Sequence, residues 1–204
     1  MTRDFPTPDA LATAMAARVA AALAADIAAT GTATLAVSGG TTPRRFFQAL
    51  SQTPLAWAQV TVILVDERCV PETSPRSNTA LVRAHLLQGP AAAARFVPLT
   101  SLLPPLTVAV LGMGLDGHTA SFFPGGDNLA AALDPTGTAA SLPMTAPGAD
   151  EPRLTLTLPV LARAKHLLLH IEGSAKRAVL ENAQNLPIHA VLTARPDIEI
   201  FWSP

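Results

Sequence analysis

The sequence has few of the residues that most directly reveal a protein's chemistry. Only one cysteine, Cys69, occurs among the 204 residues, which excludes an internal disulfide and any metal site built from several cysteines. We expect Cys69 to be a small buried side chain rather than a nucleophile. No second histidine or cysteine stands near His118 in a metal-ligand spacing, so the sequence predicts no metal site.

Net charge and long apolar runs are also scarce. The chain has 14 basic and 15 acidic residues, for a formal net charge of −1, so no general attraction to nucleic acid or to a membrane surface is expected. Any anion must therefore be bound by a local cluster. The alanine-rich amino end is interrupted by prolines and by charges such as Asp4, Arg18 and Asp26. It therefore resembles neither a signal peptide nor a membrane span, and we expect a soluble, cytoplasmic protein.

The sequence does contain enough apolar residues for a sizeable core. Hydrophobic residues make up 49% of the chain and charged ones 14%, and this length suits one domain over residues 1–204. The first predicted helix follows Thr7 as its cap, has Pro8 in its first position and ends at Gly31. Between them, apolar residues recur every fourth position, which favours a helix.

Short apolar runs then alternate with helical patterns. We predict strands at 32–37, 60–65, 107–111, 153–158, 166–171 and 198–202, and further helices at 43–50, 77–87 and 174–184. This alternation is typical of an α/β fold with a mostly parallel, doubly wound sheet and helices on both faces. The Leu/Thr alternation from Arg153 to Leu158 predicts a strand with one wetter face, either an edge strand or a small antiparallel piece. Residues 89–106 and 134–152 are read as surface crossovers.

Chemistry is expected at the carboxyl ends of the strands, where open α/β sheets bind their ligands. The first candidate is the loop Ser38, Gly39, Gly40, Thr41, Thr42 before the helix at 43–50. Two glycines and a helix start can present backbone N–H groups to a phosphate. The alternative is a tight turn before a well-capped helix. The loop matches neither the P-loop nor the dinucleotide-binding fingerprint.

Two further candidates follow strands. Asp66-Glu67-Arg68 ends the strand at 60–65 and must emerge at the sheet edge, either as part of a site or as a solvated ion pair. Asp116-Gly117-His118 follows the strand at 107–111. An aspartate two residues before a histidine can raise its basicity and fix its tautomer. The alternative is a polar turn between two buried segments.

Isolated cations form the last candidate set. Arg153 opens the Leu/Thr strand, and Lys176 stands near a helix start, where a cation opposes the helix dipole. Each either meets an anionic ligand or points to water. No role is assigned to the four remaining histidines. Of these, His189 is expected to be packed, and His166 and His170 are expected to decorate strand ends.

The order of these motifs along one chain is more informative than any of them alone. The segments SGGTTP, DERCVPETSPRSN, LGMGLDGHTASFFPG, RLTLTLPVLARA and EGSAKRAVL together resemble the 6-phosphogluconolactonase family, which shares its fold with glucosamine-6-phosphate deaminases. The resemblance runs from about Leu35 to Leu192. It implies hydrolysis of 6-phospho-D-glucono-1,5-lactone to 6-phosphogluconate in the pentose phosphate pathway, by a carboxylic ester hydrolase without metal or cofactor.

The resemblance also implies roles for the candidate residues. His118 would be the general base that activates water, and Asp116 would orient it or tune its pKa. The loop Ser38–Thr42 and Lys176 would hold sugar or phosphate oxygens. Arg68 and Arg153 would supply positive charge to the phosphate or to the oxyanion. The expected partner is a small phosphosugar lactone, and a monomer is expected.

Some features depart from the family pattern. Members usually carry a helix with a Tyr-Glu pair between the second and third sheet strands. Here residues 89–106 are too short for it, and the chain has no tyrosine. The carboxyl end stops at FWSP without the usual tail. The shortened segment and the shortened carboxyl end would remove peripheral structure, and they could alter the rim of the site or contacts between subunits.

Two other functions remain open on the same fold. An amino-sugar-phosphate isomerase or deaminase would continue from DGH into a Gly-Phe-Asn-Glu-Pro run, but TASFFPG has no glutamate there. A non-catalytic sugar-phosphate sensor would need an attached DNA-binding segment, for which no basic arm exists. The presence of both Asp116 and His118 fits catalysis better than sensing.

Overall fold

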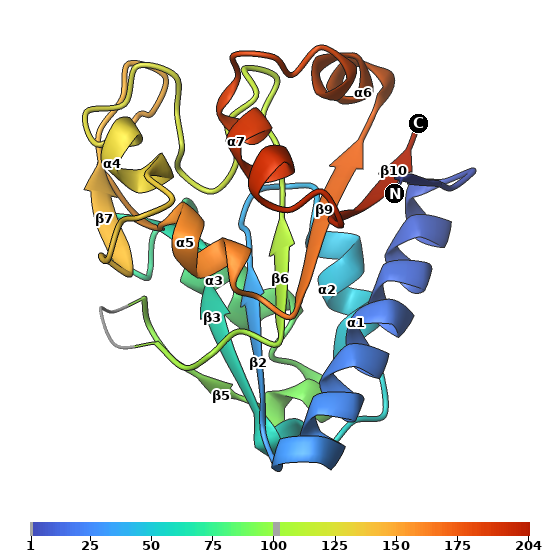
Figure 1. The fold of residues 1–204 in the computed structure, drawn as a ribbon. Coiled ribbons are helices and arrows are strands. Elements are labelled where there is room, and N and C mark those ends of the chain that lie inside the picture. The colour runs from blue at the N-terminus through green and yellow to red at the C-terminus, as the bar shows by residue number, and fades with distance from the viewer. Residues whose placement is uncertain (1, 100–102) are drawn as a thin grey trace.

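The larger of two sheets is built from strands at both ends of the chain. The computed structural model describes residues 2–99 and 103–204. Seven strands, each parallel to its neighbours, follow the order β1-β10-β9-β6-β2-β3-β5. Figure 1 shows the two termini close together, because β1 pairs with β10. The strands are β1 (Thr2–Asp4), β2 (Ala33–Val37), β3 (Val60–Leu64), β5 (Arg95–Phe96), β6 (Val108–Leu111), β9 (His166–Glu172) and β10 (Glu199–Ser203).

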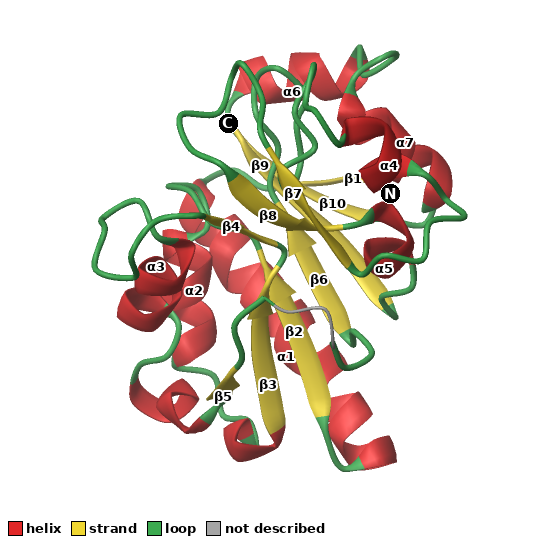
Figure 2. Cartoon of the chain, turned by 90° about the vertical axis from the view of Figure 1, so that its left-hand side faces the viewer, coloured by secondary structure: helices red, strands yellow, loops and turns green. Residues whose placement is uncertain are grey.

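Helices cover both faces of this sheet, which confirms the predicted α/β class (Figures 1 and 2). One face packs against α1 (Pro8–Thr30), α2 (Arg44–Ser51) and α3 (Asn78–His85). The other packs against α4 (Leu129–Leu133), α5 (Leu158–Ala162) and α7 (Pro187–Ala194). Central strands such as β2 are buried along their whole length, which explains their continuous apolar sequence. Two short 3₁₀ turns lie at Trp57–Gln59 and Gly89–Ala93.

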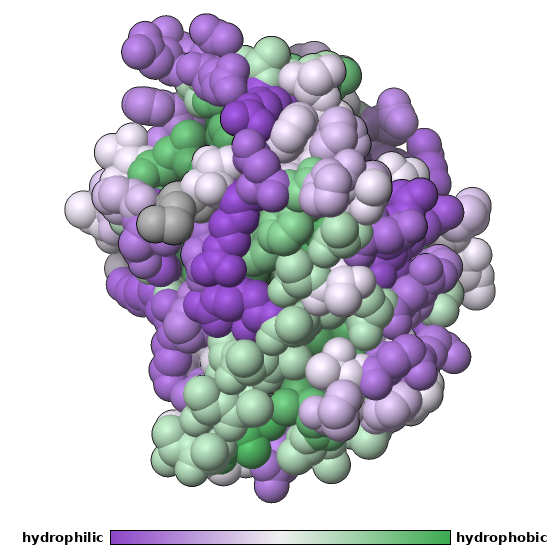
Figure 3. All heavy atoms as spheres, turned by 90° about the vertical axis from the view of Figure 1, so that its right-hand side faces the viewer, coloured by the Kyte–Doolittle hydropathy of each residue, from purple (hydrophilic) through white to green (hydrophobic). Residues whose placement is uncertain are grey.

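The first helix begins and ends as its sequence predicts. Thr7 Oγ1 accepts a hydrogen bond from the N–H of Ala10, and Gly31 ends the helix in the left-handed conformation. By length and composition α1 could cross a membrane, but 44% of its most apolar window is buried inside the structure. Figure 3 views this side of the molecule and shows hydrophilic residues beside its pale apolar patches. The helix thus serves as a core helix, as its packing against β2 and α2 shows.

A small antiparallel sheet sits beside the larger one. Its strands β4 (Asp66–Arg68), β8 (Arg153–Leu156) and β7 (Ser141–Met144) run in the order β4-β8-β7. The antiparallel alternative for the Leu/Thr strand is therefore confirmed, whereas the edge alternative is wrong because β8 is central. The prediction that one face of this strand is more exposed to water is also wrong. Thr155 and Thr157 are buried, and their hydroxyls are satisfied by Ser121 N–H and by the carbonyl of Ala139.

Other predictions need correction. Residues 89–106 contain a 3₁₀ turn and β5, and residues 134–152 contain β7; positions 100–102 lie outside the described residues. The helix expected at 174–184 is α6 (Ser174–Glu181) and ends earlier. Cys69 is exposed rather than buried, because it follows β4 into a surface loop. His189 is exposed on α7 rather than packed, and His170 is buried inside β9 rather than at a strand end.

Candidate active site

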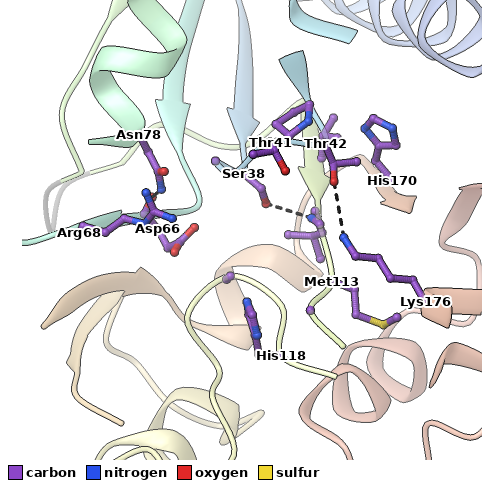
Figure 4. Close-up of a pocket in the computed structure, with 18 of the residues that line it drawn as sticks. Ser38, Thr41, Thr42, Asp66, Arg68, Asn78, Met113, His118, His170 and Lys176 are labelled. Carbon is purple, nitrogen blue, oxygen red and sulfur yellow. Dashed lines mark hydrogen bonds between the residues drawn. The ribbon is translucent and has the colours of Figure 1, made fainter. Parts of the chain in front are cut away.

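A cavity of about 220 Å³ opens at the carboxyl ends of the central strands (Figure 4). Of the ten residues singled out from the sequence, nine line it, and the tenth, Asp116, contacts one of the nine. The nine lining residues are Ser38, Gly39, Gly40, Thr41, Thr42, Arg68, His118, Arg153 and Lys176. The fold thus brings together motifs from β2, β4, β6, β8 and α6 that are far apart in the sequence.

The turn after β6 is shaped around the contact between Asp116 and His118. His118 Nδ1 donates to Asp116 Oδ1 at 2.6 Å, since a carboxylate oxygen can only accept. This bond leaves Nε2 as the acceptor nitrogen of the neutral ring. A side chain at Gly114 would displace this pair, because its Cβ would lie 2.3 Å from the His118 ring and 2.5 Å from the Asp116 carboxylate. The glycine therefore makes room for the pair.

The residues that follow His118 anchor this turn. Thr119 and Ser121 are fully buried. Thr119 Oγ1 donates to the carbonyl of Gly112 at 2.8 Å, and Ser121 Oγ donates to Asp66 Oδ2 at 2.7 Å. Between them Ala120 adopts φ +48°, an uncommon conformation for a residue with a side chain. The turn is thereby tied both to the end of β6 and to the small sheet.

Phe123 connects the histidine with one of the predicted cations. The centroids of the His118 and Phe123 rings lie 4.3 Å apart, and the Arg153 guanidinium carbon lies 5.1 Å from the Phe123 centroid. An arginine in this position interacts favourably with the aromatic ring. Phe123 thus holds both side chains beside the pocket.

The three charged residues of β4 perform three different tasks. Glu67 accepts hydrogen bonds from the N–H groups of Asn78 and Thr79, at 2.8 and 2.7 Å, and so caps the amino end of α3. Asp66 is only 5% exposed and faces the pocket, and Arg68 also lines it. The solvated ion pair considered for this segment is therefore wrong.

Asp66 and Arg153 form the ionic centre of this side of the pocket. Arg153 Nη1 lies 3.7 Å from Asp66 Oδ2. Burial raises the pKa of Asp66, and this effect outweighs the hydrogen bond from Ser121 and the nearby cations, which act in the opposite direction. Burial likewise lowers the pKa of Arg153, while Asp66 counteracts this shift. Each charge here thus compensates part of the other's desolvation.

The glycine loop after β2 packs tightly against α3. A Cβ at Gly39 would lie 1.8 Å from Asn78 Oδ1, so only glycine fits there. Ser38 Oγ accepts from the N–H of Gly112 at 3.1 Å, which ties the loop to the end of β6. Close packing to both neighbours fixes where the loop's backbone N–H groups can face a ligand.

Lys176 lies on the other side of this loop, as Figure 4 shows. Its Nζ is 3.5 Å from Thr42 Oγ1. No carboxylate lies within salt-bridge distance of Lys176 in the described ranges 2–99 and 103–204. Burial lowers the pKa of Lys176, and Glu172 partly offsets this effect. Within the described part of the chain, this half-buried cation therefore has a hydroxyl beside it but no carboxylate at salt-bridge distance.

Several residues that line the pocket were given no role from the sequence, among them Asp66, Asn78, Met113 and His170. Phe123, which contacts His118 and Arg153 beside the pocket, was given none either. Asp66 and Asn78 stood within quoted motifs but were given no role. His170 carried one usable signal: a histidine near the carboxyl end of an otherwise apolar strand. In β9 it shares a face with Leu168, which packs under α1 and α2.

Unpaired polar atoms concentrate in this pocket. Within the described part of the chain, Arg68 Nε, Asn78 Oδ1, Arg153 Nε and His170 Nδ1 are buried without a hydrogen-bond partner. Leaving such an atom unpaired costs about 1–3 kcal/mol. Four of them around one cavity indicate a site for a polar ligand. Among the same described residues, no cluster of three His, Cys, Asp or Glu side chains could hold a metal ion.

The fold and the pocket define an α/β protein with a site for a small anionic, polar ligand at the carboxyl edge of its sheet. A family model described as "Glucosamine-6-phosphate isomerases/6-phosphogluconolactonase" matches residues 6–107 and 101–202. The chain belongs to this family.

Individual relatives agree with this assignment. The chain is 52% identical over 223 aligned positions to the 6-phosphogluconolactonase of Mesorhizobium japonicum, covering 98% of this chain and 94% of the relative. It is 46% identical to that of Pseudomonas aeruginosa, covering 95% and 90%. The crystal structure of a 6-phosphogluconolactonase from Shewanella baltica superimposes with a TM-score of 0.94 at 35% identity, covering 100% of this chain and 97% of the other. The first alignment is longer than this chain, so that relative has residues this chain lacks.

Proposed function

We propose that this chain hydrolyses 6-phospho-D-glucono-1,5-lactone to 6-phospho-D-gluconate, the lactonase step of the pentose phosphate pathway. One observation carries the proposal: the Asp116–His118 pair lies at the same cavity as the glycine loop and Lys176. The lactone has an electrophilic carbonyl at one end and a phosphate at the other, so it needs a base and an anion site in one pocket. The relatives named above support this substrate.

His118 acts as the general base. Asp116 holds Nδ1–H, so Nε2 is free to take a proton from water as the water oxygen attacks the lactone carbonyl carbon. The tetrahedral intermediate then collapses and breaks the bond between that carbon and the ring oxygen. The imidazolium returns its proton to the departing ring oxygen, which gives the free acid and restores the neutral base.

Arg153 and Arg68 supply positive charge where the carbonyl oxygen becomes negative. Arg153 is held by Asp66 and Phe123 beside His118, so its guanidinium needs little reorganisation when charge develops. Arg68 donates from Nη1 to the carbonyl of Arg76 and keeps a buried, unpaired Nε at the pocket. We assign the oxyanion to this side of the pocket.

Lys176 and the Ser38–Thr42 loop bind the phosphate. Among the described residues no carboxylate lies within salt-bridge distance of Lys176, and the loop adds backbone N–H groups and hydroxyls. A phosphate dianion would supply the missing negative charge. We further propose a soluble, cytoplasmic monomer that uses no metal or cofactor and binds neither nucleic acid nor membrane.

The decisive experiment is a turnover assay with the purified chain. Fresh 6-phosphoglucono-1,5-lactone is added, and acid release is followed at constant pH, with spontaneous hydrolysis subtracted. We expect enzymatic turnover that His118→Ala abolishes almost completely. The same preparation is offered glucosamine 6-phosphate and assayed for ammonia. Ammonia release without lactone hydrolysis would favour the deaminase alternative, and binding without turnover of either would favour the sensor.

A further inference from the structure

His170 lies at the phosphate side of the pocket and has no role in the mechanism above. It is 2% exposed, lines the cavity, and stands next to Thr42 in Figure 4. The edge-on Phe46 ring, 6.3 Å away, packs against the imidazole. The ring is therefore held in one orientation by its surroundings.

Only one of the two ring nitrogens has a partner. His170 Nε2 lies 3.1 Å from Glu172 Oε1, whereas Nδ1 is buried and makes no hydrogen bond within residues 2–99 and 103–204. A buried polar atom without a partner calls for an explanation. A ligand in the pocket that His170 lines provides one.

The contact with Glu172 fixes which nitrogen carries the proton. The hydrogen bond from His170 lowers the pKa of Glu172, so this carboxylate is ionised and can only accept. Nε2 must therefore be the protonated nitrogen. In the neutral ring Nδ1 is then an acceptor, and it becomes a donor only when the imidazole takes up a second proton.

Phosphate requires the donor form. A phosphate monoester dianion has only acceptor oxygens, so a neutral His170 would face it with two lone pairs opposed. The charged groups around the ring are Glu172 on the same strand, Lys176 on α6, and Arg45 on α2, which lies 3.9 Å from Glu172. A phosphate dianion bound among these groups adds negative charge beside the His170 ring, and this charge favours the protonated imidazole.

We propose that His170 is a further phosphate-binding residue, which takes up a proton when the phosphate group docks and donates from Nδ1 to a phosphate oxygen. The inference rests on the proposed function and deepens it. His170 lines the cavity, and Nδ1 is the ring nitrogen for which the described residues provide no partner.

Proton uptake can be measured directly without turnover. Binding of 6-phosphogluconate is followed by calorimetry in two buffers of different ionisation enthalpy. At about pH 7.5 phosphate monoesters are almost fully dianionic, so they contribute little to the exchange. We expect uptake of a fraction of a proton by the wild-type chain and distinctly less by His170→Gln, with Lys176 present in both. No uptake by the wild-type chain, or equal uptake by both, overturns the proposal.

Two substitutions separate phosphate binding from support of Glu172. His170→Gln can keep the contact with Glu172 but has no group at the Nδ1 position, whereas His170→Asn can place an amide there and loses Glu172. We expect His170→Gln to raise KM for the lactone and the inhibition constant of 6-phosphogluconate by about tenfold to a hundredfold, the range for a hydrogen bond to a charged group. His170→Asn should bind phosphate better than His170→Gln.

The opposite order would make His170 a structural support for Glu172 and overturn the proposal. His189→Gln, at an exposed histidine on α7 outside the pocket, is the matched control and should change neither constant. Lactone turnover by the wild-type chain tests the proposed function separately. Turnover combined with unchanged constants in His170→Gln would refute only this inference.

Discussion

The two sides of the pocket balance their charges in different ways. On the side of His118, two groups have a carboxylate partner: His118 with Asp116, and Arg153 with Asp66, while Arg68 on the same side donates to the carbonyl of Arg76. On the side of the glycine loop, Lys176 contacts the Thr42 hydroxyl instead of a carboxylate. The paired side is ready to act on a neutral carbonyl, where charge develops only during the reaction. The unpaired side suits a ligand that already carries charge.

This difference suggests which cations bind the phosphate and which stabilise the oxyanion, a question that the order of the motifs left open. The resemblance left Arg68 and Arg153 open between the phosphate and the oxyanion, and it implied that Lys176 holds sugar or phosphate oxygens. Because Asp66 already offsets part of the charge of Arg153, a dianion gains more from Lys176. Variants on the two sides should therefore fail differently: those at the paired side in kcat, and those at the loop side in KM.

The largest effect is expected at His118. His118→Ala removes the base, and turnover should fall by roughly 10²- to 10⁴-fold while affinity for 6-phosphogluconate persists. Rates are measured with fresh lactone, and His189→Gln serves as the control for loss of a histidine. A His118→Ala enzyme with the wild-type rate would show that another group activates the water.

Asp116→Asn tests whether the partner of His118 matters as much as its geometry suggests. The amide keeps the size of the side chain, but it can present its NH₂ to the ring and favour the wrong tautomer. Since Asp116 is partly exposed rather than buried, we expect kcat to fall by about 10- to 100-fold, less than for a buried aspartate in a catalytic triad. KM should change little. A fall in affinity without a fall in kcat would place Asp116 in substrate binding instead.

Lys176→Ala should raise KM by about 10- to 100-fold and change kcat much less, since it removes a charged contact to phosphate. Lys176→Arg keeps the charge and should recover part of the affinity. Steady-state kinetics with the lactone measure both constants. If Lys176→Ala reduced kcat at unchanged KM, the assignment of the two sides would have to be reversed.

Much of this architecture could be predicted from the sequence. Helix α1 carries its own cap signals at Thr7 and Gly31, and the β2, β3 and β6 runs are apolar enough to indicate buried parallel strands. The loop Ser38–Thr42 and the Asp116–His118 motif can also be recognised in the sequence. The glycines of the loop provide backbone freedom, and an aspartate two residues before a histidine can form a local hydrogen bond. Nine of the ten predicted residues do line one cavity.

What could not be predicted depends on contacts between distant segments. The burial of Asp66 arises from Ser121, Arg153 and the pairing of β4 with β8, all of which involve residues far from it in the sequence. Thr155 appeared to mark a wet face because the partner of its hydroxyl, the N–H of Ser121, lies 34 residues away. Short elements such as β7 and α5 have too few residues for a periodic pattern, and tertiary packing decides them.

Gly39→Ala tests how closely the loop must approach α3. The new Cβ would overlap Asn78 Oδ1, and Asn78 cannot move freely because its Nδ2 donates to the carbonyl of Asp66. We expect the free energy of unfolding to fall by about 1–3 kcal/mol, as for overpacking, together with a raised KM. Gly148→Ala is the control, since nothing lies within 4 Å of its Cβ position. Urea unfolding of both variants measures the difference, and equal stability would contradict the tight packing of this loop.

The smallest effect is the pH dependence of stability that the buried Asp66 confers. Burial raises its pKa above the usual 3.8, so the folded chain binds this proton more tightly than the unfolded chain does. Its contribution to stability is therefore greatest below about pH 4 and declines as pH rises through the folded-state pKa. Asp66→Asn removes this titration, so the variant should gain stability relative to the wild-type chain as pH rises above about 4. Asp134, whose pKa is lowered by hydrogen bonds from Thr136, should show the opposite trend when changed to asparagine. Urea unfolding at several pH values compares both variants with the wild-type chain.

If the free energies of unfolding of Asp66→Asn and the wild-type chain changed with pH in the same way, Arg153 and Ser121 would fully offset the desolvation of Asp66. Burying the Asp66–Arg153 pair would then have no net electrostatic cost to the stability of the folded chain.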